Sequence, residues 1–89
     1  MKAIVTVVGK DRVGIIAQVS TQLANLNINI LDISQTVMQG YFTMMMVVEV
    51  SECSVPLAEL CKAMDAKGQE MGLSIRVQRE DIFEAMHRV

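Results

Sequence analysis

The order in which strand-like and helix-like hydrophobic patterns alternate constrains the fold of this chain more than any other feature. Residues 2–8 are apolar and β-branched on both faces, which is typical of a buried central strand. Apolar and small residues then recur at helical spacing from Arg12 to Asn25. Two more strands are expected over 28–38 and 41–50, joined by the short turn Gln39-Gly40.

The second half of the chain again places a helix before a strand. Ser54-Val55-Pro56 opens the expected helix, and Gly72 ends it. A strand with one wet face is expected at 73–78, and residues 80–89 are expected to form a short C-terminal helix with an apolar side. The order predicts an α+β, ferredoxin-like βαββαβ fold in one domain, residues 1–89. Its four-stranded antiparallel sheet carries two helices on one face.

The third strand predicts that a further element covers the second face of the sheet. Residues 41–48 are apolar on both faces, but the two helices cover only one face of the sheet. We therefore expect the C-terminal helix, a second subunit, or both to cover the other face. The hydrophobic fraction of 52% also favours surface buried between subunits, in a homodimer or a tetramer. We expect sheets paired edge to edge into eight strands, with the first strand as the seam.

Composition excludes several classes of function. The net charge is −2 without a basic cluster, and there are only three aromatic residues, so no nucleic-acid partner is expected. No apolar run reaches the roughly 18 residues of a membrane span. Cys53 and Cys61 form no CxxC pair, so we interpret them as free thiols and expect no metal and no cofactor. Met1-Lys2 leads directly into a strand rather than a signal peptide, which favours the cytoplasm.

The segment Val7–Ala17 predicts a small-molecule pocket. Its polar turn places Asp11 as a helix N-cap and Gly14 near the third helical position, where glycine costs about 1 kcal/mol. A glycine at a locally unfavourable position suggests that something comes close to the backbone. The start of a helix is also a natural seat for a carboxylate or a phosphate.

Three segments resemble the ACT domain, a small ligand-binding module of regulated amino-acid enzymes. Residues 7–17 and 26–33 are similar to the general ACT signature, and the tail 80–89 resembles a family of stand-alone ACT-domain proteins. The resemblance implies an amino acid bound between the first turn and the start of the second strand, often across a dimer interface. The implied ligand-binding residues are Gly9, Asp11, Arg12, Val13, Gly14, Ile15, Asn29, Ile30 and Leu31.

Several of these residues have alternative interpretations. Asp11 is an N-cap or accepts a ligand ammonium group, and Asn29 contacts a ligand or bonds to its own backbone. Asp32 interrupts an apolar strand. It is a site residue, or it lies on a solvated face or pairs with a nearby basic residue. The lone His87 makes no catalytic set, and the eight methionines are core or interface residues rather than a metal site.

The preferred function is a non-catalytic, homodimeric module that binds an amino acid and signals through an unidentified protein partner. A ligand-free interaction dimer is the alternative. Arg12 and Asn29 faintly resemble the acylphosphatase pattern, but the aromatic-arginine pair expected before the helix is missing. The segment Gly9–Gly14 contains no cysteine, which argues against metal trafficking. Gly14→Asp is expected to abolish ligand binding and leave the fold intact.

Overall fold

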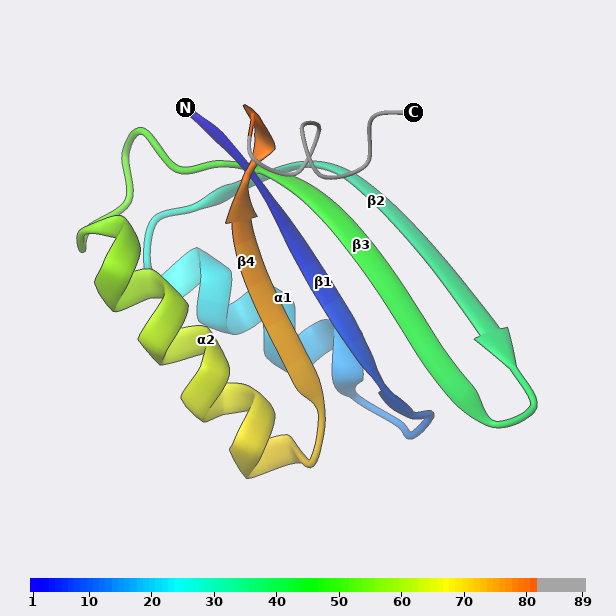
Figure 1. Cartoon of the computed structure of the whole chain (residues 1–89). Helices are drawn as coiled ribbons and strands as arrows, with labels where there is room; N and C mark the ends of the chain where they lie inside the picture. The colour runs from blue at the N-terminus through cyan, green and yellow to red at the C-terminus, as the bar shows by residue number, and fades with distance from the viewer. Residues whose placement is uncertain (82–89) are drawn as a thin grey trace.

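A computed structural model gives the fold and describes residues 1–81 (Figure 1). The expected C-terminal helix falls mostly on residues 82–89, which lie outside the described residues. The element order is the predicted one, and most boundaries agree to within two residues. The elements are β1 (Lys2–Lys10), α1 (Ile15–Asn25), β2 (Asn29–Met38), β3 (Tyr41–Glu49), α2 (Leu57–Met71) and β4 (Ser74–Arg79).

The four strands form one antiparallel sheet in the order β2-β3-β1-β4. This confirms the predicted ferredoxin-like α+β fold. The prediction that the first strand forms the seam between subunits was wrong, because β1 is flanked by β3 and β4 and is not an edge strand. The edges of the sheet are β2 and β4. Since β2 has ten residues and β4 has six, β2 offers the longer free edge.

Four residues in the left-handed region, at three places in the chain, set chain reversals between the elements. Gln39 and Gly40 have φ of 52° and 81°, the signs that a two-residue type I′ hairpin requires. Asn27, with φ of 61°, follows the end of α1 as expected, and Gly72 ends α2 with φ of 72°. These turns fix the direction in which β2 and β4 enter the sheet.

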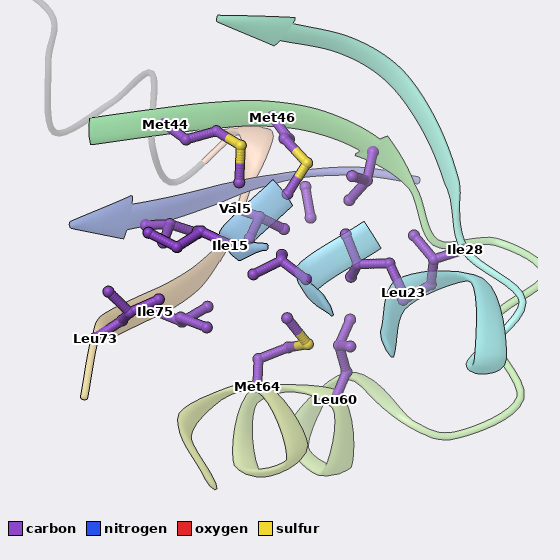
Figure 2. Close-up of a cluster of buried hydrophobic side chains, with 14 of the residues drawn as sticks. Val5, Ile15, Leu23, Ile28, Met44, Met46, Leu60, Met64, Leu73 and Ile75 are labelled. Atoms are coloured by element: carbon purple, nitrogen blue, oxygen red, sulfur yellow. The ribbon is translucent and has the colours of Figure 1, made fainter. Parts of the chain in front are cut away.

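The core lies between the two helices and one face of the sheet. Figure 2 shows Ile15 and Leu23 of α1 and Met64 of α2 pointing toward Met44 and Met46 of the sheet. Alternate residues of β3 point away from this core, and of these Tyr41 and Met45 are exposed. The third strand is therefore apolar on both faces, as its sequence predicted.

Helix α2 packs closely against the start of β4 at Gly68. A Cβ atom built there would lie 2.8 Å from the carbonyl oxygen of Leu73 and 3.3 Å from the backbone nitrogen of Ile75. Only glycine lets α2 come this near to the start of β4.

Candidate functional site

The turn between β1 and α1 is built around a left-handed glycine. Gly14 has φ of 92° and ψ of 1° and occupies the N-cap position of α1. Other L-residues are strained there, because their Cβ comes too close to a backbone carbonyl oxygen. The helix therefore begins at Ile15 instead of Arg12, and the expectation that Gly14 sits at the third helical position was wrong. The backbone N–H of Gln18 donates to the Gly14 carbonyl oxygen at 2.9 Å.

Asp11 is not the N-cap, which corrects a second expectation about this turn. Within residues 1–81 no side chain caps α1. The backbone N–H of Asp11 instead donates to the carbonyl oxygen of Gly40 at 2.8 Å. This bond ties the turn to the β2–β3 hairpin and leaves the Asp11 side chain exposed.

A hollow of about 350 Å³ lies between this turn, the first turn of α1 and the hairpin. Its charged side chains, Asp11 and Arg12, are exposed, whereas Ile15 and Phe42 are only 2% and 4% exposed. A few polar groups around an apolar base are typical of small-molecule sites. The hollow is lined by Asp11, Arg12, Gly14, Ile15, Ile16, Ala17, Gln35, Val37 and Phe42.

The structure brings four of the predicted turn residues to this hollow: Asp11, Arg12, Gly14 and Ile15. Gly9 and Val13 do not line it. A Cβ at Gly9 would overlap the far end of the Leu73 side chain, so this glycine packs against the approach to β4. Val13 stands at the tip of the turn with 99% of its surface exposed.

Sequence reasoning missed the three lining residues that come from the hairpin: Gln35, Val37 and Phe42. Phe42 is the register partner of Gly9 on one side and of Val37 on the other. The two-residue turn could have predicted the pairing of Val37 with Phe42. The pairing of β3 with β1 joins distant parts of the chain, and no local pattern predicts it.

Asn29, Ile30 and Leu31 lie at the other end of the sheet. Asn29 pairs with Glu49 on β3, whereas Gly9 pairs with Phe42 on the same strand. At about 3.3 Å per residue, these two places are about 23 Å apart along the sheet. One chain therefore does not bring the two halves of the predicted site together (Figure 1).

The start of β2 borders a second open hollow, of about 390 Å³. The side-chain nitrogen of Asn27 donates to the backbone oxygen of Glu52 at 2.8 Å, which joins the end of α1 to the loop after β3. The β2 strand is irregular between Ile30 and Asp32, so Leu31 lies in a bulge. The hollow is lined by Ala24, Asn27, Ile28, Asn29 and Glu52.

Glu49 carries the strongest electrostatic effect near this end of the sheet. Its carboxylate accepts hydrogen bonds from the N-terminal ammonium group of Met1 and from the Ser51 hydroxyl, each at 2.7 Å. The ammonium bond first, and then the Ser51 bond, lower the pKa of Glu49 from 4.5 to about 2. Glu49 is therefore an ionised carboxylate whose charge is already paired.

The other candidate residues, Asp32, Arg12 and Asn29, do not form a catalytic set at either hollow. Asp32 is exposed, and its Oδ1 accepts a hydrogen bond from the backbone N–H of Ile33 at 2.8 Å, which supports its interpretation as part of a solvated face. Arg12 and Asn29, the pair that resembled acylphosphatases, lie at opposite ends of the sheet and cannot act together within one chain.

The metal-ligating residue types are dispersed. Among residues 1–81, no three His, Cys, Asp or Glu side chains are placed to hold a metal ion. Cys53 and Cys61 are free, half-buried thiols. His87 lies outside the described residues.

Comparison with known proteins identifies the family. The model of the family described as "ACT domain" matches residues 2–78. The chain belongs to the ACT domain family. It is 58% identical over 90 residues to the UPF0237 protein of Clostridium acetobutylicum and 52% identical over 89 residues to that of Listeria innocua. Each match covers 100% of both chains, which places this chain in the UPF0237 group.

Solved structures agree with this assignment. The ACT domain protein from Streptococcus pneumoniae superposes with a TM-score of 0.83 at 50% identity, covering 98% of each chain. A formyltetrahydrofolate deformylase from Pseudomonas syringae gives a TM-score of 0.80 at 26% identity, covering 88% of this chain and 27% of that one. ACT domains are typically regulatory modules that bind small molecules. No helix within residues 1–81 has both the length and the apolar character needed to cross a bilayer.

Proposed function

We propose that this ACT domain protein is a non-catalytic regulatory module that binds an amino acid as a homodimer. The observation that carries the proposal is the hollow beside the β1–α1 turn. Asp11 and Arg12 provide one charge of each sign, which suits the ammonium and carboxylate groups of a zwitterion. Ile15 and Phe42 provide an apolar base for the side chain of the ligand.

The free edge of β2 supports the homodimer. Its outer side pairs with no strand among residues 1–81, and unpaired backbone N–H and C=O groups on such an edge favour pairing with another chain. The strand also exposes four large apolar side chains: Leu31, Ile33, Val37 and Met38. Pairing β2 with β2 of a second copy gives a continuous eight-stranded sheet. The seam at β2 replaces the one expected at β1.

Antiparallel β2 pairing also completes the ligand site. A two-fold axis near Ile33 and Ser34, the middle of the strand, places the Asn29 end of one copy beside the Val37–Met38 end of the other. Val37 lines the hollow next to the β1–α1 turn. The Asn29 region that one chain holds about 23 Å away is thus supplied by its partner.

Regulation follows from this shared site. A ligand held between two copies stabilises the dimer by mass action, by about 2.7 kcal/mol at 100 times its dissociation constant. An unidentified protein partner that distinguishes the two states then reads the ligand concentration.

The test is thermal unfolding of the chain with each of the twenty amino acids and a panel of common metabolites. Gly14→Asp is a poor control variant, because the φ of 92° strains an L-residue there and lowers Tm on its own account, even where the fold stays intact. Ile16→Lys is better, since Ile16 is partly exposed on α1 and lines the hollow. Thr21→Lys, exposed on the same helix outside the hollow, is its matched control.

A saturable rise in Tm that disappears in Ile16→Lys and persists in Thr21→Lys supports the proposal. A rise that persists in both variants places the ligand elsewhere. The absence of a rise with every compound favours the alternative, a dimer that binds only a protein partner.

A further inference from the structure

Two side chains of the β1–α1 turn are not explained by contacts within their own chain. Val13 is a β-branched apolar residue with 99% of its surface exposed. Arg12 is exposed and forms no ion pair within residues 1–81. The hydrogen bond from the Asp11 backbone N–H to the Gly40 carbonyl oxygen fixes the position of this turn. The two exposed side chains are therefore held in place by the backbone of the turn.

The second hollow has the complementary character. Its base includes Ile28, which is 7% exposed, and Ala24 adds a small apolar wall. Glu52 lies at its border, exposed and without an ion pair within the described part of the chain. The hydrogen bond from Asn27 to the Glu52 backbone holds this border against the end of α1.

Both features lie at places that the proposed dimer brings together. The β1–α1 turn is at the end of the sheet where β2 finishes (Figure 1). The second hollow is lined by Asn29, the first residue of β2, and so lies at the opposite end. Antiparallel pairing through β2 puts the turn of one copy at the same end as the second hollow of the other. Both features also lie beside α1, on the helix side of the sheet.

We propose that in the homodimer the β1–α1 turn of each copy docks on the second hollow of the other copy. Val13 packs against Ala24 and Ile28 of the second copy, and Arg12 pairs with its Glu52. The guanidinium group has five N–H donors, so Arg12 can pair with Glu52 and still donate to the carboxylate of a ligand. This inference rests on the dimer of the proposed function and adds the contact that positions the shared ligand site. Two-fold symmetry makes the contact twice in each dimer.

Disulfide cross-linking tests the contact directly. The variant Val13→Cys/Ala24→Cys is made in a background with Cys53→Ser and Cys61→Ser. Within one chain the two positions are separated by most of α1, roughly 15 Å at 1.5 Å per residue. A disulfide needs Cα atoms within about 7 Å, so oxidation yields a bond only between copies. We expect a covalent dimer on a non-reducing gel that dithiothreitol reverses.

Charge reversal is the second arm. Arg12→Glu and Glu52→Arg are each expected to raise the dimer dissociation constant about tenfold, and the double variant to restore it, because two exposed pairs contribute modestly per dimer. Arg76→Glu, a reversal on exposed β4, is the matched control and should leave the constant unchanged. Sedimentation equilibrium measures the constant, and circular dichroism checks folding of each variant.

Two single-cysteine variants in the same background, Ile33→Cys and Ser34→Cys, report on the β2 pairing itself. If either of them cross-links while the Val13/Ala24 pair does not, and the charge variants behave like Arg76→Glu, the docking contact is refuted and the β2 dimer stands. If none of them cross-links and the wild-type chain sediments as a monomer, the dimer of the proposed function fails and the docking contact falls with it.

Discussion

The substitution Gly14→Ala tests whether the backbone conformation of the β1–α1 turn requires glycine. A Cβ there would meet only the side-chain nitrogen of Gln18, at 3.6 Å, which is an ordinary contact. The cost therefore comes from the backbone conformation alone, about 1–2 kcal/mol for a left-handed residue. In a chain of this size we expect Tm to fall by roughly 4–16 °C, at about 4–8 °C for each kcal/mol.

Gly40→Ala is the matched control. Gly40 has φ of 81°, and a Cβ there would meet nothing within 4 Å, but Gly40 does not line the hollow. Thermal and urea unfolding at one protein concentration, without ligand, should show similar losses for both variants. If Gly14→Ala is as stable as the wild type, the left-handed N-cap is not what requires glycine. A much larger loss than in Gly40→Ala would indicate a steric contact instead.

Three further expectations concern stability. Gly68→Ala should lower the free energy of unfolding by about 1–2 kcal/mol, because the clash with the Leu73 carbonyl outweighs the roughly 1 kcal/mol gained in helix propensity. If urea unfolding shows a more stable variant, α2 and β4 are not closely packed at this position. Leu23→Ala should cost about 2–5 kcal/mol in the same assay, since Leu23 is fully buried, and a loss below 1 kcal/mol would contradict that burial. The folded-state pKa of Glu49 is lowered, so its contribution is present above pH 4.5 and lost as the pH falls toward 2. Glu49→Gln should therefore flatten the fall of Tm over this range, and an unchanged profile would argue against the Met1–Glu49 ion pair.

The fold could be predicted because its signals are local. Alternation at residues 73–78 and the Gln39-Gly40 turn each depend on neighbours in the sequence, and the structure confirms both. The predicted start of α1 was wrong because residue type alone does not show which backbone conformation the turn needs. Asp11 is a favourable N-cap by residue type, but Gly14 is the residue that can adopt the left-handed conformation that the chain reversal needs.

The site could be predicted only in part, because its geometry depends on strand order. The resemblance supplied the turn residues, and the structure gathers four of them at one hollow. Val37 and Phe42 join them through pairings between distant strands. The predicted seam at β1 was wrong. It also conflicted with the prediction that residues 2–8 form a central strand, because a central strand has no free edge for a second copy.

The separation of Asn29 from the β1–α1 turn has a quantitative consequence for the cell. A site that uses both places exists only in pairs of chains, so at low abundance the number of such sites grows with the square of the chain concentration. Doubling expression would then quadruple the capacity for ligand, without any change in intrinsic affinity. The number of occupied sites would then depend on both the expression of the gene and the concentration of the metabolite.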